Sequence, residues 1–275
     1  MKKFPLILAL VLILALALAG TALAITDGEP DGEGHPHVGL LIFDYEFPDG
    51  SIRPAWRCSG TLLSSKVVLT AGHCTDGASG ARLWLDSDMQ SNAEYPYAGA
   101  TSYEAGEWHT MPGYETAGPW FQYDAGIVIL AEPVTEETTY GVLPELNLLD
   151  GFKTRRGKQK LTFDAVGYGL QKSFPDAAEW KDEAEKTRMV SNPRLIQINT
   201  PGFTGDFSLL LSNNANTGGT CFGDSGGPNF LEGTNTVAGI TSFGLNPTCA
   251  GTGGVFRTDR QNVQDFVNSF LLPPD

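Results

Sequence analysis

The chain is short of cysteine, with only four among 275 residues. Four cysteines form two disulfides at most, so cross-links cannot replace a hydrophobic core, and 41% of the residues are hydrophobic. An even number of cysteines fits a secreted protein with two disulfides, and the residues alone leave three pairings open. The scarcity of cysteine therefore excludes a small disulfide-stapled scaffold and favours a globular protein with one large or two small domains.

Basic residues are also scarce. The chain has 18 lysines and arginines against 32 aspartates and glutamates, a formal net charge of −14. Loss of residues 1–24, which contain two lysines and no acid, would lower the net charge by two more units. An acidic surface repels nucleic acid and anionic membranes, keeps a protein soluble and attracts cationic substrates. We expect no nucleic-acid partner.

Residues 1–24 carry no charge beyond the lysines Lys2 and Lys3. The lysines precede an apolar run of 14 residues (6–19), and the small-x-small triplet Ala22-Leu23-Ala24 follows that run. A positive start, a short apolar core and a small-residue site are typical of a secretory signal peptide. The segment predicts cleavage after Ala24.

A membrane anchor is the alternative for the same segment. Because a membrane-spanning helix needs about 20 apolar residues, the run is short for an anchor. The first cysteine is Cys58, far from the cleavage site, so a lipoprotein is not indicated. We expect a secreted, extracellular monomer without membrane attachment once the signal is removed.

Short apolar or alternating runs, separated by Gly, Asn, Asp and Pro, make up the body of the chain. Runs of this length that are rich in Val, Ile, Leu and Thr predict the strands of an all-β barrel or sandwich. The clearest are 38–43, 66–70, 126–130, 161–166, 195–198 and 237–242. Two turn-rich stretches, 86–118 and 171–192, are expected to be surface loops.

Helical spacing occurs only near the C-terminus. The apolar residues there are Val263, Phe266, Val267, Phe270 and Leu271. Thr258 and Gln261 match a capping box before this segment, and Pro273 marks its end. One C-terminal helix is expected.

Three motifs carry the chemistry. The octapeptide Cys221–Pro228 (CFGDSGGP) holds a serine among small residues, the segment 70–74 (TAGHC) holds a histidine, and the segment 123–128 (YDAGIV) holds an aspartate. Taken singly, such a histidine is usually a core residue and such an aspartate a turn or cap. Together they occur in the order His, Asp, Ser, and they resemble the active-site motifs of the chymotrypsin-like (trypsin-fold) serine proteases.

The resemblance implies a catalytic triad. Ser225 would be the nucleophile, His73 the general base and then acid, and Asp124 the group that orients His73. Ser242 would support the triad by a hydrogen bond to Asp124. The backbone amides of Gly223 and Ser225 would form the oxyanion hole.

The same resemblance implies the fold and the cross-links. Two six-stranded antiparallel β-barrels would be followed by a C-terminal α-helix. Residues 25–143 would form the N-terminal barrel with His73 and Asp124, and residues 144–275 the C-terminal barrel with Ser225 and the helix. Of the three pairings, the resemblance selects Cys58–Cys74 and Cys221–Cys249.

Activation and substrate choice are implied as well. The sequence Ile25-Thr26-Asp27-Gly28 resembles the mature start of the family, whose α-ammonium pairs with the aspartate before the serine, here Asp224. Signal cleavage and activation would then be one cut. The substrate pocket would include Gly219, Thr220, Gly244 and Gly254. Gly219 stands where trypsin-like members carry an Asp, so an apolar or aromatic residue is expected before the scissile bond instead of Arg or Lys.

Other classes fit less well. An α/β-hydrolase needs its histidine after the serine, and all four histidines precede Ser225. No aspartate before His73 has the context of a subtilisin triad. A non-catalytic binding protein on the protease fold is the alternative that stays open, because fold alone does not guarantee activity. We expect protein or peptide substrates, with protein inhibitors as further candidate partners.

Metal sites are not indicated. His35 and His37, near the acids Asp31 and Glu33, are interpreted as polar loop residues. Asp86 and Asp88 belong to no full calcium ligand set. No metal or other cofactor is expected.

Overall fold

The computed structural model describes residues 25–114, 122–137, 139–152, 160–172, 185–200 and 204–271. The predicted signal peptide, residues 1–24, lies outside these ranges. Strands dominate, and the only α-helices among the described residues are the single turn α2 (Gly72–Thr75) and the C-terminal α3 (Gln261–Leu271), with one 3-10 helix, η1 (Leu148–Phe152). The prediction of an all-β protein with one C-terminal helix is confirmed.

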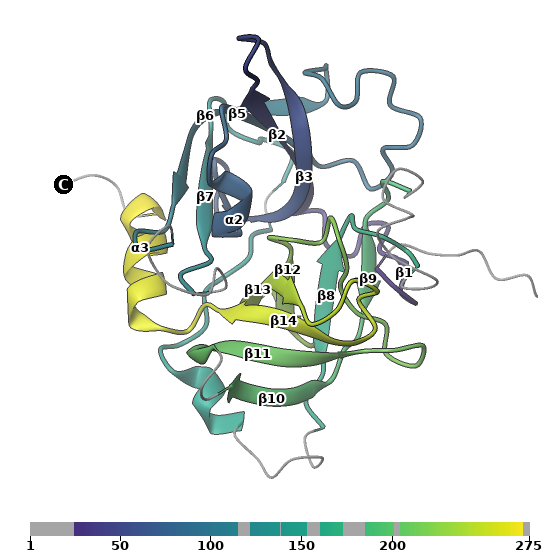
Figure 1. The fold of residues 1–275 in the computed structure, drawn as a ribbon, viewed down its shortest axis with the longest axis vertical. Helices are drawn as coiled ribbons and strands as arrows, with labels where there is room; N and C mark the ends of the chain where they lie inside the picture. The colour runs from purple at the N-terminus through teal and green to yellow at the C-terminus, as the bar shows by residue number, and fades with distance from the viewer. Residues whose placement is uncertain are drawn as a thin grey trace, which may run out of the picture.

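Six strands close the first barrel, in the order β2-β3-β4-β7-β6-β5 (Figure 1). They are β2 (Val38–Glu46), β3 (Ile52–Leu62), β4 (Val67–Thr70), β5 (Gly80–Trp84), β6 (Ser102–Thr110) and β7 (Gly126–Leu130). In β2, Leu41 and Phe43 enter the main core, whereas Leu40 and Ile42 pack with Trp84 on the other face. Both faces of β2 are covered, which explains its unbroken apolar run.

Strand β6 lies inside the stretch 86–118, which was expected to be a loop. Its sequence, SYEAGEWHT, is polar and only half-buried, and its register with β7 shifts between Ala105 and Glu107. A strand that leaves one face in water and contains a glycine lacks the apolar run by which strands are recognised. The expectation of a loop was wrong for Ser102–Thr110.

Eight strands form the second sheet, in the order β1-β9-β8-β12-β13-β14-β11-β10. They are β1 (Glu29–Pro30), β8 (Phe163–Gly167), β9 (Met189–Ser191), β10 (Leu195–Thr200), β11 (Gly205–Asn213), β12 (Pro228–Leu231), β13 (Val237–Gly244) and β14 (Gly251–Arg257). An isolated bridge between Thr162 and Arg194 links the start of β8 to that of β10. The six strands from β8 to β10 in this order therefore curl back on themselves (Figure 1). Strands β9 and β1 extend the sheet beyond β8.

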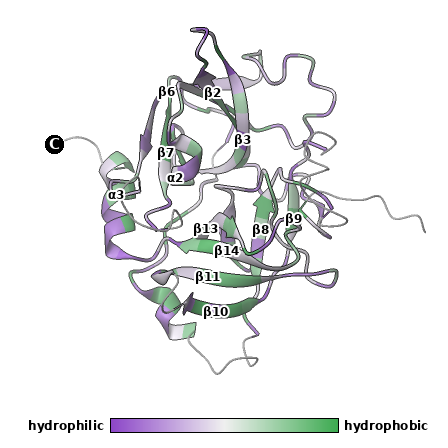
Figure 2. Ribbon diagram, viewed as in Figure 1, coloured by the Kyte–Doolittle hydropathy of each residue, from purple (hydrophilic) through white to green (hydrophobic). Residues whose placement is uncertain are grey.

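The C-terminal helix α3 returns to the first barrel. Its Phe270 ring lies 4.7 Å from the ring of His109 on β6, and Val263 and Val267 are buried. Figure 2 shows hydrophobic residues along β8, β10 and β14 and a mixture of hydrophobic and polar residues on α3. The expected capping box is not formed by the Thr258 hydroxyl, which donates to the carbonyl of Val237 instead. Within the described ranges, no helix has the length and hydropathy of a membrane span.

The interface between the barrels contains a buried histidine without a hydrogen-bond partner. His37 is 1% exposed, and neither of its ring nitrogens has a partner within the described part of the chain. Its ring lies 5.4 Å from that of Phe230 on β12. Burial, followed by the neighbouring His35, lowers the pKa of His37 from its usual 6.5 to about 4.

The folded protein should therefore lose stability in mild acid. Because the pKa is depressed, unfolded His37 takes up a proton below pH 6.5 while the folded ring resists it until about pH 4. Between these values the loss reaches about 3 kcal/mol. Urea unfolding at pH 7.5, 5.5 and 4 should show a smaller loss in His37→Phe, with His109→Phe as the control at the surface. An equal pH dependence in the wild type and His37→Phe would contradict the assignment.

Candidate active site

His73 lies on the single turn α2, directly after β4. Its Nδ1 lies 2.9 Å from Oδ2 and 3.1 Å from Oδ1 of Asp124, and its backbone amide donates to Oδ1 at 2.8 Å. Burial opposes the charged ring, but the Asp124 carboxylate outweighs burial and raises the pKa of His73 above its usual value. The two contacts to Asp124 fix both the backbone and the ring of His73.

Asp124 precedes β7 and is 1% exposed. The hydroxyl of Ser242, on β13, donates to Asp124 Oδ2 at 2.5 Å. The aspartate therefore holds groups from both barrels, since His73 comes from the first and Ser242 from the second. A carboxylate satisfied in this way can orient the imidazole and stabilise its cation.

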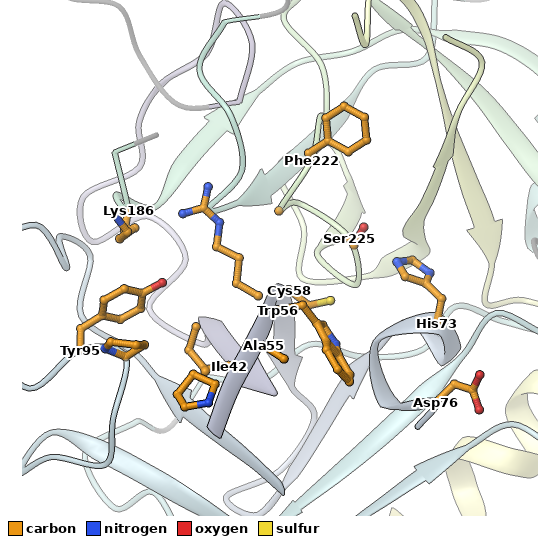
Figure 3. Close-up of a pocket in the computed structure, with 14 residues that line it drawn as sticks. Ile42, Ala55, Trp56, Cys58, His73, Asp76, Tyr95, Lys186, Phe222 and Ser225 are labelled. Carbon is orange, nitrogen blue, oxygen red and sulfur yellow. The ribbon is translucent and has the colours of Figure 1, made fainter. Parts of the chain in front are cut away.

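Ser225 lies in the loop between β11 and β12, close to His73 in Figure 3. Both residues line each of two cavities, so the cavities meet at this pair. No hydrogen bond joins the Ser225 hydroxyl to the His73 ring among the described residues. Such contacts are often long before substrate binds and tighten in the substrate complex.

The backbone of the Ser225 loop presents two amides. Neither the Gly223 nor the Ser225 N–H donates to another group of the described residues, while the Gly223 and Ser225 carbonyls accept hydrogen bonds from Ser59. Gly223 has φ +95°, a left-handed conformation that suits glycine. Two backbone N–H groups on one turn that make no other hydrogen bond can donate to a developing oxyanion.

Gly226 completes the turn and packs against the first barrel. It has φ +81°, and a Cβ there would lie 2.0 Å from the Thr70 hydroxyl and 2.4 Å from the Ser59 carbonyl oxygen. Only glycine meets both constraints. The loop is thus held against the barrel that carries His73.

Asp224 is fully buried between the two amide-bearing residues. Its carboxylate accepts hydrogen bonds from the amides of Gly169 (2.7 Å) and Cys221 (2.8 Å). Burial raises the pKa of Asp224 to about 7, against the opposing effect of these hydrogen bonds and of the Arg57 charge. A buried carboxylate in this state is stabilised by any cation that reaches it.

The segment that begins at Ile25 lies beside the substrate-pocket segment. Ile25 is fully buried against Met189. The carbonyl of Thr26 accepts a hydrogen bond from the Gly219 amide at 3.1 Å. The Thr26 hydroxyl donates to Asn213 Oδ1 at 2.7 Å. In the full chain the Ile25 nitrogen is a peptide amide, and among the described residues it forms no hydrogen bond or ion pair with Asp224.

One of the two cavities has the expected position of a substrate pocket. Its volume is about 570 Å³, and its lining includes Thr220, Phe243 and Gly244. Gly219 and Gly254, the other expected pocket residues, do not line it. A Cβ on Gly219 would lie 2.4 Å from the Asn213 side chain, and one on Gly254 would lie 2.3 Å from the Phe243 ring.

Two disulfides tie the site together. Cys58–Cys74 joins β3 to α2 with a Cα–Cα distance of 6.4 Å. Cys221–Cys249 joins the Ser225 loop to the segment before β14, with a Cα–Cα distance of 5.4 Å. These are the pairings that the family resemblance selected.

Ser59 is a buried residue of the site that sequence reasoning did not single out. Its hydroxyl donates to the Gly223 carbonyl and accepts from the Tyr168 amide, both at 3.0 Å, and its amide donates to the Ser225 carbonyl at 2.7 Å. The available signal was a polar residue beside Cys58, in the half of β3 that is buried. Ser59 therefore holds the Ser225 loop in place.

The described residues offer no evident metal site. Their one group of close ligand types is Cys58, His73 and Cys74, in which both cysteines are bonded to each other. His35 is engaged by Asp31, its Nδ1 lying 2.6 Å from Asp31 Oδ1.

Comparison with known proteins identifies the family. A family model described as Trypsin matches residues 45–267. A trypsin-like protease of Streptomyces glaucescens is 27% identical over 216 residues, which cover 77% of this chain and 73% of that protein. A collagenase of Hypoderma lineatum is 24% identical over 197 residues, which cover 72% of this chain and 69% of that protein.

Solved structures share the fold at lower identity. The HL collagenase structure has a TM-score of 0.65 at 20% identity and covers 91% of this chain and 100% of the other. A structure of HBP, human heparin binding protein, has a TM-score of 0.64 at 20% identity. The match covers 91% of this chain and 98% of the other. The chain belongs to the trypsin family of serine proteases.

Proposed function

We propose that this chain is a serine endopeptidase that acts through Ser225, His73 and Asp124. The observation that carries the proposal is the arrangement around Ser225. His73 and Asp124 are joined by hydrogen bonds, and Ser242 donates to Asp124. In the described part of the chain, the N–H groups of Gly223 and Ser225 are free to donate, and Ser225 lies where two cavities meet.

The proposed reaction proceeds by acyl transfer. The Ser225 oxygen attacks the peptide carbonyl carbon while its proton passes to His73 Nε2, and Asp124 stabilises the imidazolium that forms. The Gly223 and Ser225 amides donate to the oxyanion. When the C–N bond breaks, His73 gives its proton to the leaving amine. Water then attacks the acyl-enzyme with His73 again as base, which releases the acid and restores Ser225.

A non-catalytic binding protein is the other function that the fold can carry. One of the similar solved structures is named for heparin binding. Heparin is a polyanion, whereas this chain has a net charge of −14, so the charge does not favour that ligand here. The complete set of His73, Asp124 and Ser225 favours catalysis.

A fluorophosphonate probe tests the two functions. The chain that begins at Ile25 should be labelled on Ser225, and Ser225→Ala should lose the label and roughly 10⁴-fold or more of kcat/KM. Because the His73 pKa is raised, activity should fall on acidification with a midpoint above pH 6.5. Ser269→Ala, on the surface of α3, is the control and should be labelled normally. A folded wild-type chain that the probe leaves unlabelled would support the binding protein.

We further propose that the cut that removes the signal also activates the enzyme. Cleavage after Ala24 would place an α-ammonium, charged at neutral pH, on the buried Ile25. Asp224 forms no ion pair with a lysine or arginine of the described residues. A cation beside it would stabilise its buried carboxylate. Pairing of the two would complete the oxyanion hole without a separate zymogen stage.

Blocking the terminus tests this proposal. A chain with Gly-Ser added before Ile25 should fold, with an unchanged circular dichroism spectrum, but lose roughly 100-fold in kcat/KM because the oxyanion hole is incomplete. Asp224→Asn in the chain that begins at Ile25 should show a similar loss. The same addition at the C-terminus is the control. Full activity in the Gly-Ser-extended chain would refute the proposal that one cleavage both removes the signal and activates the enzyme.

The pocket supports an apolar or aromatic residue before the scissile bond. Its lining contains no Asp, Glu, Lys or Arg among the described residues, and Phe243 and Leu245 supply apolar surface. Gly219 has no side chain and so brings no charge, and the Asn213 side chain occupies the space next to it. A cationic side chain would enter this cavity without a partner, which is unfavourable.

Peptide profiling tests the pocket. Substrates with Phe or Leu before the scissile bond should exceed those with Arg or Lys by roughly tenfold in kcat/KM. Thr220→Asp, which adds a carboxylate to the lining, should shift the preference toward Arg and Lys. Thr234→Asp, in the turn after β12, is the matched control outside the pocket. Rapid cleavage after Arg or Lys by the unchanged chain would defeat the assignment.

The proposed setting is extracellular. The signal segment 1–24, the two disulfides and the acidic surface support a secreted enzyme. Protein or peptide substrates follow from the family, and we propose that the enzyme acts as a monomer, with protein inhibitors as candidate partners. The domain boundary near Leu143 stays a prediction.

A further inference from the structure

The second cavity at Ser225 is a groove of about 770 Å³ that the proposed mechanism leaves unassigned. It extends from Ser225 and His73 along β3 toward Tyr95 and Lys186 (Figure 3). It shares only His73, Phe222 and Ser225 with the apolar substrate pocket. The two cavities therefore lie on different sides of the reacting pair.

Two cations line this groove. Arg57, on β3, lies above the nucleophile loop, since its Nε is 3.0 Å from the position of a Cβ on Gly223. Lys186 Nζ lies 5.6 Å from the centre of the Tyr95 ring. Burial and then the Arg57 charge lower the pKa of Lys186. Both cations therefore belong to one groove, which they line together.

The groove contrasts with the rest of the molecule. The chain carries 14 more acids than bases, yet Asp76 is the one carboxylate among the described residues that line the groove. Asp76 lies beyond His73 in Figure 3, well away from Lys186 and Tyr95. No carboxylate of the described residues forms an ion pair with Arg57. Two cationic side chains that line one groove attract an anion that binds there.

We propose that Arg57 and Lys186 bind a carboxylate of the substrate segment that follows the scissile bond, so that the enzyme prefers Asp or Glu among the first three residues after that bond. This inference rests on the proposed peptidase activity. The shared chemistry is a carboxylate, which an acidic side chain or the C-terminus of a short substrate could supply. We commit to the side chain, because the groove has a volume of about 770 Å³ and is lined from Ser225 to Lys186, which suits an extended peptide.

The position of the groove determines which part of the substrate it receives. If the apolar pocket takes the side chain before the scissile bond, a peptide that crosses Ser225 must continue into the groove. An extended chain advances about 3.3 Å per residue. Since Arg57 packs on Gly223, two residues from Ser225, its guanidinium is within reach of the first residues after the bond.

The expected preference is moderate. Both cations are half-buried, so water and salt screen them, and each contributes on the scale of a partly exposed charge pair. The bidentate guanidinium of Arg57 should contribute more than the ammonium of Lys186. The negative net charge of the protein opposes binding of any anion, so a preference for one must come from these two residues.

The experiment compares pairs of internally quenched peptides that differ only by Glu or Gln at the first, second or third residue after the scissile bond. All are amidated at the C-terminus, and one Gln peptide is also made with a free C-terminal acid. The kcat/KM ratio of Glu to Gln is measured in low and high salt. The enzymes are the wild type, Arg57→Gln, Lys186→Gln and the double variant, with Arg53→Gln, on β3 outside the groove, as the matched control.

At one position the wild-type ratio should be roughly tenfold in low salt and should fall in 0.5 M NaCl. Arg57→Gln should lower the ratio to about twofold and Lys186→Gln to about fivefold, and the double variant should abolish it, while Arg53→Gln keeps the wild-type ratio. A ratio is unchanged by a general loss of activity, so a merely structural effect of a substitution would not imitate this result.

Three outcomes would overturn the inference. Equal cleavage of Glu and Gln peptides at all three positions would refute it while the peptidase activity stands. A preference confined to the free-acid peptide would assign the cations to a terminal carboxylate instead. No cleavage of any peptide, together with no fluorophosphonate label on Ser225, would refute the peptidase activity itself and this inference with it.

Discussion

The site depends on the interface between the two barrels, where Ser59 of the first barrel bonds the Ser225 loop and Ser242 of the second bonds Asp124. His73 belongs to the first barrel and Ser225 to the second, so their relative position is only as well defined as this interface. Ser59 bonds the carbonyls of Gly223 and Ser225 and the amide of Tyr168, all within 3.0 Å. These hydrogen bonds hold the Ser225 loop in place and leave the N–H groups of Gly223 and Ser225 free to donate.

Buried charge is the second constraint. Arg188 is buried with Asp31 at 2.9 Å, and Arg257 is buried with Asp259 at 2.7 Å, so these charges are compensated inside the fold. Asp224 differs, because it is fully buried and has only amide donors within the described residues. A buried carboxylate without a cationic partner, next to Ser225, links the properties of the site to any group that supplies the missing positive charge.

Much of the site could be predicted from three motifs, because each one carries a side chain together with the small residues that its local backbone needs. The glycines around Ser225 show this, since Gly223 and Gly226 both adopt φ values that favour glycine. Strand β6 was missed, because a half-exposed strand has no clear apolar run. The capping box predicted at Thr258 is not formed, because its hydroxyl donates to the distant carbonyl of Val237. Local patterns cannot reveal partners that the fold brings from elsewhere.

The sequence by itself determined the residue types of the site, their order along the chain and the all-β class, because motifs and periodicity are local properties. The tertiary structure alone decided what each residue faces. It placed the Asn213 side chain against Gly219 and the Phe243 ring against Gly254, so two expected pocket residues are covered. It also brought Arg57 and Lys186 to one groove, although they are far apart in the sequence. The physical reason is that packing of the two barrels, which no short stretch encodes, sets the distances between side chains and hence their chemistry.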